Sequence, residues 1–87
     1  MLIVHLKHQS SLEDRQAHLQ GHINWIRELL ASGQLLMAGP VMDQAPGGVL
    51  ILDVGTKEEG YAVMNNDPFV HHQLSTFDII AFDPKYQ

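Results

Sequence analysis

The chain has 87 residues, ten acidic against five basic, and its formal net charge of −5 disfavours contact with nucleic-acid phosphates. Its length suits one domain, residues 1–87, and a domain this small gains core by pairing with a second copy. Because there is no cysteine, no signal-peptide pattern in the first residues and no apolar run of about 20 residues, we expect a cytoplasmic protein without disulfides or membrane contact.

The first third of the chain predicts a strand followed by one long helix. Residues 2–7 are mostly aliphatic and indicate the strand. Ser10 and Ser11 precede acidic residues, as is typical of a helix start, and Gly33 is a common helix terminator. We therefore expect one helix over residues 14–32. Its apolar residues recur at helical spacing and form a stripe: Leu12, Leu19, Ile23, Ile26 and Leu30.

The middle of the chain predicts a hairpin. Residues 34–42 indicate a second strand, and because Gly39-Pro40 interrupts it we expect an edge position or a bend there. A turn over residues 43–48 leads to a third strand over residues 49–54.

The last third predicts two helical segments and a final strand. Thr56 and Glu59 form a capping-box pattern for a helix over residues 57–64. Asp67 is placed to cap a short helical turn that begins with Pro68. Residues 76–82 indicate the fourth strand.

The resulting order is β-α-β-β-α-β, which predicts an α+β, ferredoxin-like fold with both helical segments on one face of an antiparallel sheet. The strands are apolar on both faces, for example at residues 2–4, 49–52 and 79–82. Since helices cover only one face, the other would expose a large apolar patch. We therefore expect a homodimer that hides it.

His22 is the most informative candidate for chemistry. Helical spacing places it, with Arg15, on one shoulder of the apolar stripe, at the border between core and cleft. A half-buried histidine bonded to backbone is the simpler interpretation. Asp67 is accounted for by its capping role alone, although a carboxylate in that loop is also able to orient a histidine of the long helix. Ser75 and Thr76 are weaker candidates for the same cleft.

The other histidines do not form a recognisable site. His18 and His22 are four residues apart, a spacing that can hold a metal, but no third ligand is evident and we expect no metal. We expect His5 and His8 to be surface or dimer contacts, and Trp25 to serve packing. The roles of His71 and His72 stay open.

Three stretches resemble the YciI-like family: His22 followed sixteen residues later by Ala38-Gly39-Pro40, the run Asn66-Asp67-Pro68-Phe69, and the opening apolar strand. The resemblance implies a dimeric α+β barrel, related to muconolactone isomerases, with a His22–Asp67 dyad facing a pocket. A characterised protein of similar type is a dehydrochlorinase acting on a chlorinated hydroxyhydroquinone. This sequence departs from the family in its short DQAPGG turn after the second strand, which leaves the choice of substrate open.

The combined expectation is a small enzyme without cofactor, an isomerase or lyase. His22 and Asp67 would transfer a proton on a small cyclic, aromatic-derived substrate. Arg15, Gly39, Pro40 and Phe69 are the expected substrate contacts. The alternatives are a module of the same fold that binds a ligand or a partner without turnover, and a purely structural dimer.

Overall fold

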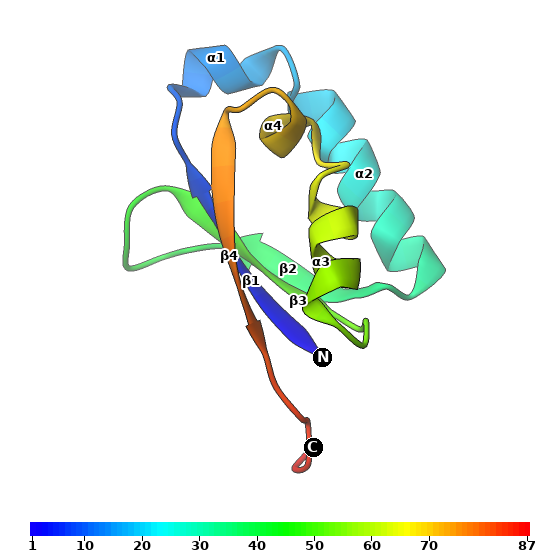
Figure 1. The fold of residues 1–87 in the computed structure, drawn as a ribbon. Coiled ribbons are helices and arrows are strands. Elements are labelled where there is room, and N and C mark those ends of the chain that lie inside the picture. Colours follow the sequence, from blue (N-terminus) through cyan, green and yellow to red (C-terminus); the bar gives the residue numbers. More distant parts are fainter.

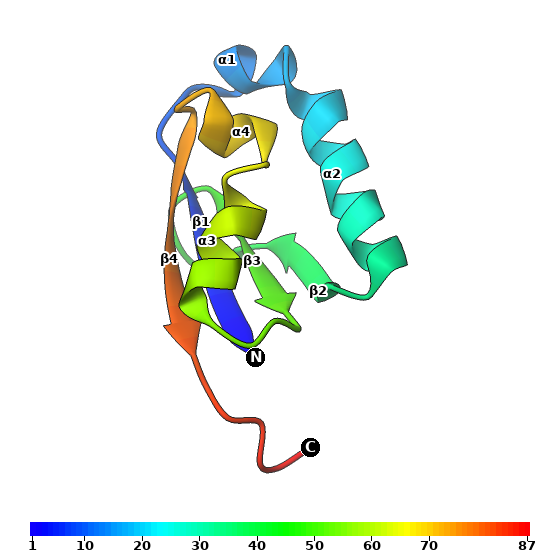
Figure 2. The ribbon, with the colours of Figure 1, turned by 45° about the vertical axis from the view of Figure 1, so that its right-hand side comes forward.

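The computed structural model describes residues 1–87 and is an α+β fold with one four-stranded antiparallel sheet. All four helices lie on one face of the sheet, which we call the inner face, and the outer face carries none (Figures 1 and 2). In chain order the elements are β1 (Leu2–His8), α1 (Leu12–Gln16), α2 (Leu19–Ser32), β2 (Leu35–Pro40), β3 (Gly47–Leu52), α3 (Lys57–Met64), α4 (Pro68–His71) and β4 (Ser75–Ala81).

The sheet order β2-β3-β1-β4 confirms the predicted ferredoxin-like topology. Helical segments connect β1 to β2 and β3 to β4, whereas β2 and β3 form a hairpin. The prediction that the Gly39-Pro40 strand lies at an edge is also confirmed, since β2 pairs only with β3.

The prediction of one long helix is wrong, because the helix breaks at Ala17–His18 into α1 and α2. The His18 N–H bonds to the carbonyl oxygen of Arg15, three residues back, and its φ of −114° is not helical. The break coincides with the six residues between Leu12 and Leu19 that carry no member of the apolar stripe. With no core contact there, continuing a single helix gains nothing from packing.

The predicted buried stripe of α2 is also displaced. Trp25 and Leu29 are its buried residues, whereas Leu19 and Leu30 are 41% and 47% exposed. His22 precedes Trp25 by three residues and Leu29 by seven, so it lies beside the buried residues of α2, where the helix borders the cleft. Trp25 packs in the core, as expected.

The β2–β3 turn lies two residues earlier than predicted, because β2 ends at Pro40 instead of residue 42 and β3 begins at Gly47 instead of residue 49. A Cβ at Gly47 would lie 2.1 Å from the carbonyl oxygen of Leu6, so only glycine permits β1 and β3 to pair this far. The hairpin end that results is made largely of backbone.

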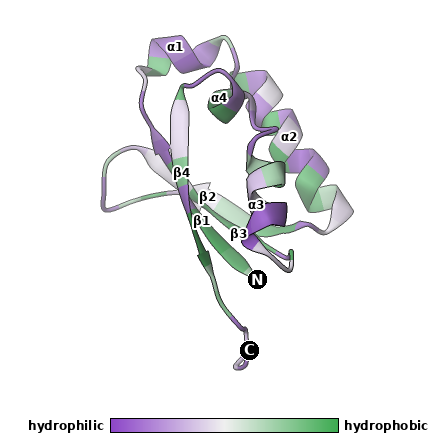
Figure 3. Cartoon of the chain, in the orientation of Figure 1, coloured by the Kyte–Doolittle hydropathy of each residue, from purple (hydrophilic) through white to green (hydrophobic).

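The core lies between the inner face of the sheet and helices α2 and α3. Figure 3 shows hydrophobic residues along the first half of β1 and the end of β4, and hydrophilic residues over most of α1. The predicted caps are present, since Thr56 accepts from the Glu59 N–H at the start of α3 and Asp67 accepts from the Phe69 N–H at the start of α4. None of the helices combines the length and apolar character that crossing a membrane requires.

The outer face carries a row of apolar side chains. Strand register places Met37 beside Ile51, Ile51 beside Ile3, and Ile3 beside Ile80. Met37 and Ile80 at the two ends of the row are 63% and 62% exposed. This is the patch that led us to expect a dimer, and the dimer itself stays a prediction.

Candidate active site

A cleft of about 380 Å³ opens between α2 and the hairpin end of the inner face. Strands β1, β2 and β3 form one wall, and α1, α2 and the start of α4 form the other. Five of the six predicted site residues line it, namely Arg15, His22, Gly39, Pro40 and Phe69. Its volume lies in the range of small-molecule sites.

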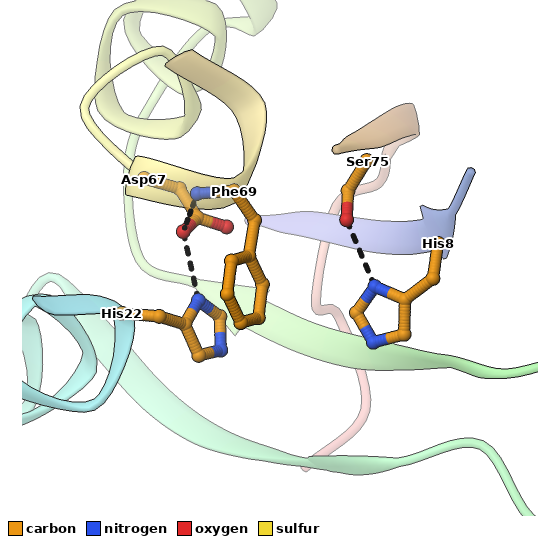
Figure 4. Close-up of polar contacts among 5 residues, drawn as sticks. All are labelled: His8, His22, Asp67, Phe69 and Ser75. Atoms are coloured by element: carbon orange, nitrogen blue, oxygen red, sulfur yellow. Dashed lines mark hydrogen bonds and ion pairs between the residues drawn. The ribbon is translucent and has the colours of Figure 1, made fainter. Parts of the chain in front are cut away.

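Asp67 does not line the cleft but lies wholly buried behind it. Its Oδ1 accepts a hydrogen bond from the Phe69 N–H at 3.0 Å and contacts His22 Nδ1 at 2.7 Å (Figure 4). An ionised carboxylate only accepts hydrogen bonds, so the hydrogen belongs on Nδ1 of the imidazole. The Nε2 atom of neutral His22 therefore carries a free lone pair.

Local sequence explains why α2 and α4 bring these two side chains together. Asp67 followed by Pro68 is a favoured helix start, and it turns the carboxylate back over the first turn of α4. Gly21 precedes His22 on α2, and a Cβ there would lie 3.3 Å from Pro68 Cγ. The role of Gly21, whose small size lets α4 pack closely on α2, was not predicted.

Aromatic contacts hold the His22 ring in place. It stacks on Phe69, with ring centroids 4.1 Å apart and ring planes 10° apart. The ring centroid of Trp25 lies 5.9 Å from that of His22. The side chain is only 17% exposed. With one ring nitrogen bonded to Asp67 and one face covered by Phe69, the imidazole has little rotational freedom.

The environment of Asp67 favours a positive partner. Its Oδ2 is buried and makes no hydrogen bond. A buried carboxylate is costly unless an opposite charge accompanies it. When His22 gains a proton on Nε2, Asp67 is the group that stabilises the resulting imidazolium.

His8 was expected at the surface or in a dimer contact, but the structure places it in the cleft wall. It ends β1 opposite Ser75 in β4, and its Nδ1 lies 2.8 Å from Ser75 Oγ (Figure 4). Burial, and then the positive charges of Arg15 and protonated His22, lower the pKa of His8 against the opposing effect of Asp67. Alternation along the strand could have predicted this position, since Leu2, Val4 and Leu6 face inward and His8 follows Leu6 by two residues.

Ser75 and Thr76 do not line the cleft, although both were considered for it. Ser75 is 3% exposed and lies behind His8. It therefore supports a residue of the cleft wall instead of forming the wall itself.

Arg15 supplies positive charge to the cleft. Its Nη1 donates to the carbonyl oxygen of Ser10, and no carboxylate of the chain pairs with it. A guanidinium held by backbone and left without an anionic partner is suited to attract an anion.

The remaining histidines lie apart from this cleft. His18 and His72 stack on each other with centroids 3.9 Å apart, and His5 faces outward on β1. No group of three or more His, Asp or Glu side chains is arranged to hold a metal ion.

Comparisons with known proteins agree with this fold. The sequence profile of the YCII-related domain matches residues 1–83. One similar solved structure is 5-chloro-2-hydroxyhydroquinone dehydrochlorinase from Burkholderia phenoliruptrix, in complex with 2,5-dihydroxybenzoquinone. The alignment covers 95% of this chain and 94% of that one, with a TM-score of 0.76 and 20% sequence identity. No curated protein sequence matches the chain.

Proposed function

The chain belongs to the YCII-related domain family, and from that premise we propose that its cleft is an active site in which His22 and Asp67 transfer a proton on a small cyclic substrate. The observation that carries this proposal is the orientation of one imidazole. His22 lines the cleft while a wholly buried carboxylate bonds its Nδ1, which leaves Nε2 free. This is the arrangement of a histidine base oriented by an acid.

The proposed reaction begins when His22 Nε2 takes a proton from a carbon or oxygen of the substrate. Asp67 stabilises the imidazolium. Return of the proton to another atom of the ring completes an isomerisation, whereas departure of a leaving group completes an elimination. Neither route needs a group beyond the side chains named, and general acid–base catalysis contributes roughly 10²–10⁴-fold to such rates.

The cleft walls favour a planar, electron-rich ring as substrate. The stacked rings of Phe69 and His22 lie on one side of the cleft, and Gly39 and Pro40 lie on the other. Arg15 favours a ring that carries an anionic oxygen. The Burkholderia neighbour is described as acting on a chlorinated hydroxyhydroquinone. We therefore propose hydroxylated or quinone-like rings and related lactones as the substrate class.

We also propose that two copies pair through the outer face of the sheet. The exposed row that ends in Met37 and Ile80 gives this face an apolar strip across all four strands. Pairing would bury it without closing the cleft, which opens on the opposite face. Light scattering should give twice the chain mass for the wild type and a smaller mass for Ile80→Asp. A wild-type monomer at tens of micromolar would contradict the pairing.

The function is tested with His22→Asn. Asparagine keeps an N–H near the position of Nδ1, and so keeps a donor for Asp67, but it removes the distal nitrogen. Chloride release from 5-chloro-2-hydroxyhydroquinone and isomerisation of muconolactone are the assays, and we expect at least a 10²-fold loss in kcat. His72→Gln, outside the cleft, is the matched control and should retain wild-type turnover.

Ligand binding separates the alternatives. Trp25 is the only tryptophan and lies near His22, so quenching of its fluorescence reports binding of 2,5-dihydroxybenzoquinone. Binding of this probe without turnover by the wild type would favour the non-catalytic module. Turnover that is unchanged in His22→Asn would remove His22 from the mechanism.

A further inference from the structure

We propose that His8 is a second catalytic residue, a neutral hydrogen-bond donor for the substrate oxygen on which negative charge develops while His22 removes the proton. This inference rests on the proposed function and adds a role that the dyad does not fill. His8 and His22 line the same cleft from opposite walls, β1 and α2. Both rings lie against Phe69 (Figure 4). The His22 ring stacks on it, and the His8 ring lies edge-on, with the two ring centroids 5.7 Å apart.

The hydrogen-bond partner of His8 determines which nitrogen carries its hydrogen. Ser75 Oγ lies 2.8 Å from His8 Nδ1 and has no other hydrogen-bond partner. Ser75 is 3% exposed, so its hydroxyl hydrogen has to be donated within the protein. The only acceptor in reach is His8 Nδ1. A neutral imidazole that accepts at Nδ1 carries its hydrogen at Nε2.

His8 and His22 therefore hold opposite tautomers. Asp67 fixes hydrogen on Nδ1 of His22 and leaves Nε2 as an acceptor. Ser75 fixes the reverse arrangement in His8 and leaves an Nε2–H donor. One cleft thus contains a base and a donor, selected by a carboxylate on one side and a hydroxyl on the other.

The charges around His8 keep this donor neutral. The groups that act on it are the guanidinium of Arg15, the imidazole of His22 and the carboxylate of Asp67. Burial and the positive charge of Arg15, joined by that of His22 once it has taken a proton, outweigh the carboxylate, so the pKa of His8 is lowered from its ordinary value. A neutral imidazole donor is an established means of polarising a carbonyl oxygen.

The proposed step forms an enolate, with the proton on His22 and the oxygen held by His8. The C–H bond next to a ring carbonyl breaks, its proton goes to His22 Nε2, and its electron pair forms a C=C bond. The carbonyl π electrons move to oxygen, where the His8 N–H holds the enolate by a hydrogen bond. Collapse of the enolate re-forms the carbonyl, and either His22 returns the proton elsewhere on the ring or the leaving group departs with its bonding pair.

Imidazole nitrogen chemical shifts test the tautomers without any substrate. Two-bond ¹H–¹⁵N spectra at pH 7.5, assigned with His8→Gln and His22→Asn, should show Nε2–H for His8 and Nδ1–H for His22 in the wild type. Ser75→Ala should shift His8 toward a mixture of the two tautomers. A His8 that carries hydrogen on Nδ1 in the wild type, or that is protonated at this pH, overturns the inference.

Turnover tests the donor role. His8→Gln keeps an N–H close to the position of Nε2, whereas His8→Leu keeps the bulk and removes the donor. We expect a fall in kcat of about 10²-fold for His8→Leu, typical for loss of an oxyanion donor, and at most about tenfold for His8→Gln. His8→Leu should also weaken binding of 2,5-dihydroxybenzoquinone, followed by Trp25 fluorescence.

The two proposals fail in different ways. Loss of turnover in His22→Asn together with wild-type turnover in His8→Leu overturns the role of His8 alone. Wild-type turnover in His22→Asn overturns the proposed function instead. The tautomer and probe-binding measurements then still decide whether His8 is an oxygen-binding donor.

Discussion

The two ends of the inner face show how one sheet serves two purposes. At the α3 end, Leu2, Leu52 and Met64 are wholly buried and the space is filled. At the hairpin end the same strands border a cleft lined by rings and glycine backbone. The inward residues of β1 make the transition, since three aliphatic side chains are followed by His8. The filled end supplies stability, and the open end holds the polar groups suited to chemistry.

Asp67 belongs to both ends, because it is part of the buried interior and also orients a side chain of the cleft. A substitution of Asp67 should therefore change both the free energy of unfolding and turnover, whereas a substitution at one end alone should change only one of the two.

Asp67→Asn should have the largest effect. The amide has no charge to balance a protonated His22, so we expect kcat to fall about 10²–10³-fold. The amide nitrogen in the place of Oδ2 would be buried without an acceptor, which should lower the free energy of unfolding by about 1–3 kcal/mol. Steady-state kinetics and urea unfolding measure the two effects. A loss of stability with unchanged kcat would show that Asp67 serves only as a cap.

Gly60→Ala should affect the filled end alone. A Cβ at Gly60 would lie 2.4 Å from Leu2 Cδ1, so a wholly buried side chain has to move. We expect the free energy of unfolding to fall by about 1–3 kcal/mol, with binding of 2,5-dihydroxybenzoquinone unchanged. Gly39→Ala is the control at the open end, where a Cβ meets nothing within 4 Å, and it should cost no stability. Equal losses for the two variants would contradict this contrast.

His8 should make the stability of the open end depend on pH. Its pKa in the folded state lies below the ordinary value of 6.5, so between the two values the unfolded chain binds more protons. The free energy of unfolding therefore rises with pH, and His8 lowers it increasingly as the pH drops below about 6.5. The difference in unfolding free energy between wild type and His8→Gln, measured from pH 8 to pH 5, should move in favour of the variant. A difference that stays constant over this range would refute the prediction.

Gln73→Gly should have the smallest effect. Gln73 is the only non-glycine residue with positive φ, at 60°, and it lies between α4 and β4 at the open end. Glycine relieves the left-handed strain but adds freedom to the unfolded chain. We expect a net stabilisation below about 1 kcal/mol by thermal unfolding, and a destabilised variant would show that the glutamine side chain itself contributes.

The sequence predicted the features that depend on neighbouring residues. Alternation and turn residues determine the strands, and the oxygens of Thr56 and Asp67 cap the helices that follow them. The pairing of Asp67 with His22 was expected from the family resemblance and is present as a contact. The catalytic roles of these two residues stay predictions.

The features that were missed depend on contacts between distant segments. The break at His18 and the exposure of Leu19 and Leu30 follow from how α2 packs on the sheet and α4, which the spacing of apolar residues along one helix does not determine. His8 was missed for a different reason. Its alternation with Leu6 was visible, but only the register with Ser75 gives its ring a buried partner.

The shared oxygen of Asp67 has one more consequence. Because Oδ1 accepts from the Phe69 amide and also contacts the His22 ring, any motion that carries the Asp67 carboxylate away breaks both contacts at once. Deuterium exchange at the Phe69 amide therefore reports those openings of the dyad in which the carboxylate moves. A ligand that engages His22 from the cleft should slow this exchange without touching the amide itself.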